Sequence, residues 1–115
     1  MRITALESRR YRFPLDPPFV AAWDPHPRHH FDETIVIAHT DAGTAGYAGG
    51  APAPDLLALE SLVAGADPED TDRVFEICRN VDFHGGRNWT VEVAVWDLMA
   101  RSREVPLWEL LGADR

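Results

Sequence analysis

The sequence contains no lysine, because all 11 of its basic residues are arginines. Without lysine the chain has neither the side chain that a phosphate-binding P-loop requires nor a Lys-type catalytic acid or base. Positive charge is scarce altogether, since 19 acidic residues give a formal net charge of −8 at pH 7. A chain this acidic has no electrostatic footprint for nucleic acid or for an anionic membrane surface, so we expect neither as a partner.

Cysteine and long apolar runs are also nearly absent. The one cysteine, Cys78, excludes an intrachain disulfide, and its place in an apolar helical pattern predicts a buried, inert thiol. No apolar run approaches the roughly 20 residues that span a bilayer, and no signal-peptide pattern opens the chain. We therefore expect a cytoplasmic protein. Its 115 residues, 45% hydrophobic and 26% charged, are enough for one globular domain.

The first half of the chain predicts three strands. Residues 2–13 and 32–40 are rich in strand-forming residues, and 44–50 follow a short turn at 41–43 that contains glycine. Residues 14–30 hold five of the nine prolines, which fix φ and remove backbone donors. We expect this stretch to be a long, stiffened loop in an antiparallel meander.

From residue 55 onward the apolar period changes from two to the helical value. Leu56, Leu59 and Val63 share one face of a first helix, and Gly65 is placed to end it. A second helix is predicted to begin with Asp67 as its N-cap, followed by proline. Its buried stripe would comprise Val74, Ile77, Cys78 and Val81.

A third helix, for which Asn88 is the candidate cap, is apolar over more than half of its circumference. One stripe comprises Val91, Ala94, Val95 and Leu98, and another comprises Trp89, Val93, Trp96 and Ala100. An ordinary surface helix has an apolar arc of somewhat over 100°, so we expect this helix to be covered on two sides. The sheet supplies one cover, whereas the other is not obviously encoded in the chain.

These elements define the predicted domain organisation. We assign residues 1–105 to one domain, with a sheet over 2–50 and helices over 54–104. Residues 106–115 form a short fourth helix, which begins at a proline, and the start of a linker.

The densest group of chemically active side chains lies at residues 23–30, "WDPHPRHH", which contain Asp24, His26, His29 and His30. Carboxylate and imidazole groups suit zinc and similar ions, but this spacing matches no known ligand arrangement. A solvated or substrate-facing loop is the favoured interpretation, and we assign no metal ligands. The alternative is a stand-alone interaction or metal-binding module that uses residues 24–30.

The glycine-rich stretch 43–50, "GTAGYAGG", is only superficially similar to a phosphate loop. It lacks the following lysine, so its glycines indicate tight turns and close backbone approach. None of Ser8, Ser61 and Ser102 lies in the strand–turn–helix context of a nucleophilic serine. The motifs therefore identify no catalytic residue.

Four segments in order carry a resemblance to a known family: "PPF" (17–19), "TIVIAHTDAGTAGYAGG" (34–50), "VAGADPED" (63–70) and "VEVAVWDLMARSREVPLWELLG" (91–112). Together they resemble the amino-terminal capping domain of the enolase superfamily, in its mandelate racemase/muconate-lactonizing branch. The resemblance implies an α+β fold, with a three-stranded antiparallel meander followed by a bundle of three to four helices. It also implies that a (β/α) barrel covers the third helix.

The chemistry of that family lies in the barrel. Its members abstract a proton α to a carboxylate and stabilise the product on Mg²⁺, with base and metal ligands on barrel strands. A barrel needs about 200–250 residues, and three residues follow Gly112. The resemblance thus implies no catalytic residue and no cofactor in this chain, Mg²⁺ in a parent racemase, dehydratase or cycloisomerase, and a barrel partner in cis or in trans. Alone, the chain would be inactive, would self-associate, and would meet a carboxylate substrate only with the barrel.

In the family, two capping-domain loops close over the barrel mouth, and they match residues 16–30 and 48–54 here. The second departs from the family pattern "G-x-G-E", because this chain has "GYAGG". The implied specificity residues are Phe19, Trp23, Asp24, His26, His29, Gly49 and Gly50. The implied barrel-facing residues are Trp96, Leu98, Trp108 and Leu111.

Overall fold

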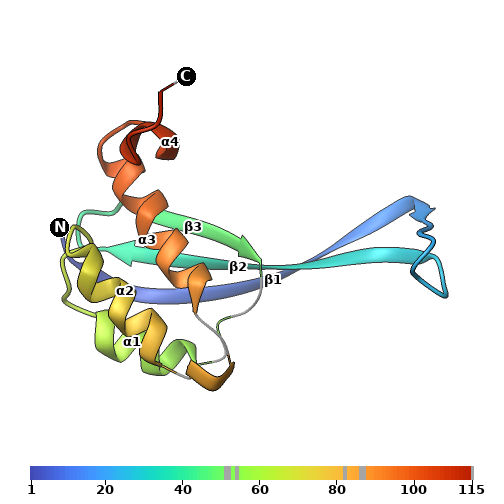
Figure 1. Ribbon diagram of the computed structural model, residues 1–115, viewed down its shortest axis with the longest axis horizontal. Helices are drawn as coiled ribbons and strands as arrows, with labels where there is room; N and C mark the ends of the chain where they lie inside the picture. The colour runs from blue at the N-terminus through green and yellow to red at the C-terminus, as the bar shows by residue number, and fades with distance from the viewer. Residues whose placement is uncertain (51–52, 54, 82, 86–87, 115) are drawn as a thin grey trace.

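A computed structural model describes residues 1–50, 53, 55–81, 83–85 and 88–114. Its strands are β1 (Ile3–Phe19), β2 (Arg28–Thr40) and β3 (Ala45–Gly50), and its helices are α1 (Leu56–Val63), α2 (Thr71–Asn80), α3 (Trp89–Ser102) and α4 (Leu107–Leu110), with a 3₁₀ turn at Phe83–Gly85. The strands form one antiparallel sheet in the order β1-β2-β3, and α3 lies across it (Figure 1). The predicted α+β class, a three-stranded meander followed by helices, is confirmed.

Beyond β3, strands β1 and β2 continue as a two-stranded ribbon that extends away from the helices (Figure 1). The prediction of a loop over residues 14–30 is wrong, because strands include 14–19 and 28–30 and leave only 20–27 as the connection. Prolines are tolerated here because β1 is an edge strand, where a missing N–H need not break a ladder. The pairing is irregular between Pro14 and Phe19, the interval that contains Pro17 and Pro18.

The core lies between one face of the sheet and the helices. Strand residues Val36, Ala38 and Ala48 alternate along β2 and β3, and each is at most 6% exposed. The helices contribute the predicted stripes, namely Leu59 and Val63 of α1, Val74 and Cys78 of α2, and Val91, Ala94, Val95 and Leu98 of α3. Within the described residues, no helix combines the length and the apolar character that crossing a bilayer requires.

Gly46 of β3 sets the distance between the sheet and α3. A Cβ added there would lie 2.1 Å from the carbonyl oxygen of Ala94 and 2.3 Å from the amide nitrogen of Leu98. Since backbone atoms cannot move aside as a flexible side chain can, only glycine permits this approach. The glycine-rich stretch therefore serves close packing, as the sequence predicted, and Gly43 with φ +78° forms the preceding turn.

Two helix carboxylates bind backbone donors at the edges of the sheet. The amide of Leu6 on β1 donates to Glu60 Oε2 of α1 at 2.7 Å. On the other edge, the amide of Tyr47 donates to Asp97 Oδ2 of α3 at 2.9 Å. Asp97 also accepts from Arg101 Nε at 2.7 Å. These bonds tie each edge strand to the helix that covers it.

The helix ends agree only partly with the sequence predictions. Gly65 follows α1 with φ +78°, as expected for a residue that ends a helix. The predicted N-cap of α2 is wrong, because Asp70 caps it and accepts from the Arg73 amide at 3.3 Å. Asp67 instead accepts from the Glu69 amide at 3.0 Å, in a turn that precedes the helix. Asn88 does stand before α3, but its side chain donates to the Val81 carbonyl at 2.8 Å.

We expect Gly46→Ala to lower the free energy of unfolding by about 3 kcal/mol, because the new methyl group collides with the α3 backbone. Gly49→Ala in the same strand is the matched control. Its Cβ would be nearest to the ends of two side chains, at 3.4 Å from Ile35 Cδ1 and 3.7 Å from Glu33 Oε1, so we expect a change below about 1 kcal/mol. Urea denaturation followed by circular dichroism measures both. Equal stabilities of the two variants would contradict the tight approach at Gly46.

Candidate functional site

The predicted specificity residues of the first loop gather at the free end of the ribbon. Phe19 ends β1, His29 lies in β2, and Trp23, Asp24 and His26 lie in the connection between them. The side chain of Trp23 is 77% exposed, and Phe19, His26 and His29 are also exposed. Asp24 is less available, because its carboxylate accepts from Arg28 Nε.

The predicted residues of the second loop do not join this group. Gly50 pairs with Thr34, at the root of the ribbon, whereas the free end begins at Arg28. Arg28 and Thr34 are six positions apart along β2, or about 20 Å at ~3.3 Å per residue. Residues 51, 52 and 54 of the predicted loop lie outside the described residues.

The histidine-rich segment gives no support to the metal-binding alternative. Asp24 is already paired with Arg28, and His30 lies in β2 opposite Pro14. Over the described ranges, no three or more His, Cys, Asp or Glu side chains come together as metal ligands.

A hollow at the root of the ribbon was missed by the sequence analysis. It has a volume of about 420 Å³ and is lined by Ser8, Arg10, Asp32, Thr34 and Gly50. The alternation of Ser8, Arg10 and Arg12 along β1 placed three polar residues on one strand face. The partners opposite them depend on the strand register, which no local pattern of these residues specifies.

Electrostatics at this root centre on one carboxylate between two arginines. Asp32 accepts from Arg10 Nη2 at 2.8 Å, and from Arg12 Nε at 2.8 Å and Nη2 at 3.0 Å. Hydrogen bonds from Arg12, and to a lesser extent from Arg10, hold the pKa of Asp32 well below its usual range. Asp32 is therefore ionised at neutral pH and is a poor proton acceptor, and the three groups carry one net positive charge.

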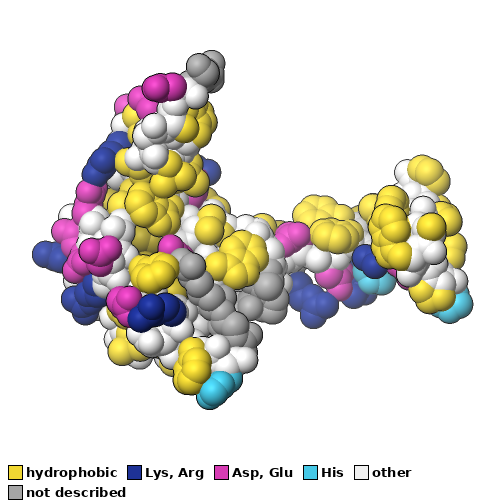
Figure 2. All heavy atoms as spheres, in the orientation of Figure 1, with side chains coloured by type: hydrophobic (Ala, Val, Ile, Leu, Met, Phe, Trp, Pro, Cys, Tyr) yellow, Lys and Arg dark blue, Asp and Glu magenta, His cyan; other side chains and the backbone are white. Residues whose placement is uncertain are grey.

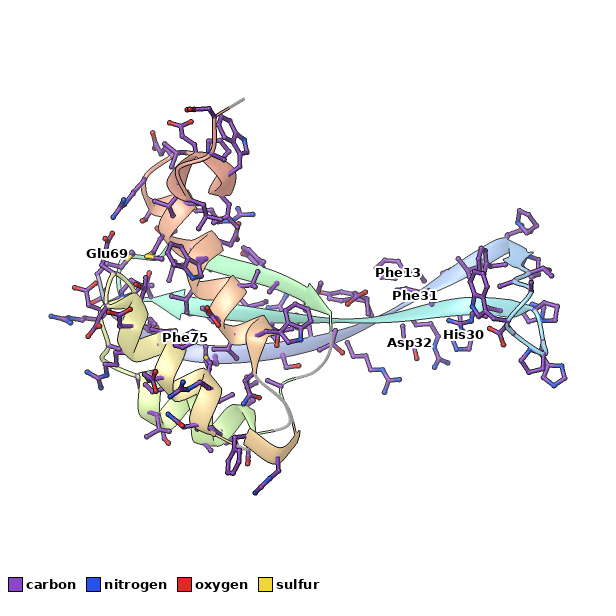
Figure 3. All side chains as sticks on the ribbon, in the orientation of Figure 1. Phe13, His30, Phe31, Asp32, Glu69 and Phe75 are labelled. Carbon is purple, nitrogen blue, oxygen red and sulfur yellow. The ribbon has the colours of Figure 1, made fainter. Side chains whose placement is uncertain are left out.

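The other face of the ribbon is aromatic. Phe13 and Phe31 are cross-strand partners on one side of the ribbon, while Asp32 and His30 project from the other (Figure 3). The ring of Tyr11 stacks on Phe13 with centroids 6.4 Å apart. Cross-strand aromatic pairs contribute about 0.2–1 kcal/mol to such a ribbon.

The outer side of α3 and the adjoining α4 form an apolar surface (Figure 2). This α3–α4 patch comprises Trp89, Val93, Trp96, Trp108 and Leu111. All are exposed except Trp96, which is half-buried. Leu98, predicted to face a barrel, is 0% exposed and packs in the core of the domain, so that prediction is wrong for this residue. The barrel-facing role of Trp96, Trp108 and Leu111 stays a prediction.

Comparison with known proteins shows similarity at the level of structure. No protein-family model matches the sequence, and no curated protein matches it. Similar solved structures include an N-succinyl Arg/Lys racemase from Bacillus cereus, with 22% identity and a TM-score of 0.76, covering 96% of this chain and 33% of that one. A dipeptide epimerase from Cytophaga hutchinsonii has 22% identity and a TM-score of 0.78, covering 100% of this chain and 34% of that one.

A third similar structure, D-glucarate dehydratase from Agrobacterium tumefaciens, has 23% identity and a TM-score of 0.78, and the match covers 100% of this chain and 33% of that one. The chain has the fold of the matched third of these enzymes, a three-stranded antiparallel sheet followed by helices. It spans about a third of the length of these solved structures. The shared fold accounts for the element order and the antiparallel meander.

We expect Arg12→Gln to raise the pKa of Asp32, because the Arg12 hydrogen bonds are the largest cause of its lowering. Arg10→Gln should raise it by less. Since the folded pKa is depressed, pairing stabilises the ribbon above the ordinary carboxyl pKa, and this stabilisation is lost as pH falls through the folded value. Titration of the Asp32 carboxyl carbon by NMR measures the shift. An unchanged pKa in Arg12→Gln would contradict this assignment of its cause.

Proposed function

We propose that the chain is the capping and substrate-specificity domain of a protein like mandelate racemase or muconate-lactonizing enzyme. The observation that carries the proposal is a fold match over the whole chain to about a third of each similar enzyme. Those enzymes include a racemase, an epimerase and a dehydratase. Their shared chemistry would be α-proton abstraction from a carboxylate substrate.

In this proposal a (β/α) barrel, joined in cis or bound in trans, supplies the catalytic groups. The dipeptide epimerase and the D-glucarate dehydratase were both solved with magnesium. The part of this chain that the structure describes brings no suitable set of ligand side chains together, so we place Mg²⁺ in the barrel. The chain alone would be inactive.

The contribution of this chain would be to bind, orient and enclose the substrate. Its ribbon end presents Phe19, Trp23, His26 and His29 on a two-stranded arm, which can reach over a barrel mouth (Figure 1). Aromatic side chains at such a position would exclude water and shape the pocket. Gly49 and Gly50 would act nearer the root of the arm.

The α3–α4 patch would be the surface that packs against the barrel. It exposes two tryptophans, Trp89 and Trp108, on adjoining helices, which is more than isolated surface residues account for. Burial of this surface would supply the hydrophobic free energy that holds the two domains together. In the chain alone the same surface would favour self-association.

We expect Val93→Glu to weaken self-association of the isolated chain at least tenfold, because it places a charge between Trp89 and Trp96 on α3. Leu57→Glu is the matched control, since Leu57 is 83% exposed on α1, outside the α3–α4 patch. Sedimentation velocity over a concentration series measures the change. Self-association that persists in Val93→Glu but is lost in Leu57→Glu would show that the self-associating surface lies at α1 and not at the α3–α4 patch.

A chimera tests the function itself. This chain replaces the matched third of the Cytophaga hutchinsonii dipeptide epimerase, and α-proton exchange of dipeptides in D₂O is followed by NMR with and without Mg²⁺. We expect Mg²⁺-dependent exchange by the chimera and none by the isolated chain, with acrylamide quenching of tryptophan reduced at least twofold in the chimera. A folded chimera whose tryptophans stay as accessible as in the isolated chain would refute the capping role.

A further inference from the structure

The hollow at the root of the ribbon is lined by a row of residues that crosses all three strands of the sheet. Arg10 of β1 pairs with Thr34 of β2, and Thr34 pairs with Gly50 of β3. Ser8 and Asp32 complete the lining from the neighbouring positions on the same face. Five residues from three strands thus surround one hollow of about 420 Å³, which is within the usual range of ~300–1,000 Å³ for small-molecule sites.

The hollow offers hydrogen-bond donors from the guanidinium of Arg10 and the hydroxyls of Ser8 and Thr34. Arg10 uses Nη2 to hold Asp32, and its side chain is 73% exposed. Its other N–H groups, like the hydroxyls of Ser8 and Thr34, have no hydrogen-bond partner in the part of the chain that the structure describes. Both oxygens of Asp32 already accept from arginine. A ligand rich in acceptors could therefore receive hydrogen bonds from all three side chains.

The local charge favours an anion. Asp32 with Arg10 and Arg12 leaves one net positive charge, in a chain of net charge −8. The acidic neighbours Glu7 and Glu33 occupy alternate strand positions and so project from the opposite face of the sheet. A single positive charge with two nearby hydroxyls matches a carboxylate monoanion better than a phosphate dianion.

An aromatic ring lies beside Gly50, one of the residues that line the hollow. The Trp89 ring lies so close to Gly50 that a Cβ there would be 2.3 Å from Trp89 Cη2. An indole against this edge gives the apolar part of a ligand a surface to contact, while Arg10 and the hydroxyls face its charged end. The site thus has two chemically different sides.

We propose that this hollow binds a small organic carboxylate, whose oxygens accept hydrogen bonds from Arg10, Ser8 and Thr34 and whose apolar part contacts Trp89. Asp32 does not bind the ligand but fixes the guanidinium of Arg10. The site goes beyond the capping role, because its hydrogen-bond donors lie on β1 and β2, outside both the ribbon end and the α3–α4 patch.

Benzoate is a suitable probe, and benzamide is its neutral counterpart of the same shape. Each is titrated into the ¹⁵N-labelled chain at constant ionic strength, and backbone amide and Arg Nε shifts are followed by NMR. We expect benzoate to shift Ser8, Arg10, Thr34 and Gly50 in a saturable way, with benzamide at least tenfold weaker. Inorganic phosphate separates the two anion types, and tighter binding of phosphate than of benzoate would overturn the carboxylate assignment.

Arg10→Gln and Arg12→Gln are a matched pair, since each removes one positive charge and one partner of Asp32, but only Arg10 lines the hollow. We expect Arg10→Gln to weaken benzoate binding at least tenfold and Arg12→Gln less than threefold. Equal losses of benzoate affinity in the two variants would show long-range electrostatic attraction without a defined site.

Thr34→Val is the second variant, to be used if Arg10→Gln does not fold. We expect it to weaken benzoate binding about threefold, and unchanged binding in this variant would refute the proposal. A chain that fails to bind benzoate leaves the capping role standing, because the chimera tests that role separately.

Discussion

The contact between Gly46 and the backbone of α3 is the constraint on which the rest of the arrangement depends. It brings β3 so close to Ala94 and Leu98 that no side chain fits between them. One stripe of α3 is consequently pressed into the sheet, and the opposite stripe with Trp89 and Val93 is turned outward. The same proximity lets a carboxylate on α3 reach a strand amide. The core, the α3–α4 patch and the hydrogen bond from the Tyr47 amide to Asp97 therefore all follow from the close approach of β3 to α3.

Much of the fold was predictable because its signals are local. The spacing of Leu56, Leu59 and Val63 predicted α1, and the stripe of Val91, Ala94, Val95 and Leu98 predicted the buried face of α3. The prolines led to the wrong prediction of a loop over residues 14–30. A missing backbone N–H breaks hydrogen bonds in a central strand, but an edge strand of a ribbon tolerates it. The prediction for Leu98 was also wrong, because the apolar character of a helical residue does not show whether it packs against the sheet or against another domain.

The candidate site was predictable only in part, for a different reason. Phe19, Trp23 and His26 are close in sequence, so their gathering at the end of the ribbon required no tertiary information. Arg10 and Thr34 are distant in sequence and meet through strand register, which is fixed by the whole sheet. The two faces of the ribbon also differ in chemistry, because Phe13 and Phe31 lie on one face and Asp32 with its two arginines lies on the other (Figure 3). A two-stranded ribbon is marginal by itself, and these cross-strand pairs are what hold it.

The carboxylates of Glu60 and Asp97 have a consequence for encounters between molecules. Outward-facing amides on a sheet edge are templates on which a foreign strand can add. At Leu6 and Tyr47 those amides are already bound by a charged acceptor from the protein's own helices. An invading strand would have to displace a charge-assisted bond and face a negative group in place of an open donor. One outward-facing amide on each flank of the sheet is thereby unavailable for intermolecular β-pairing.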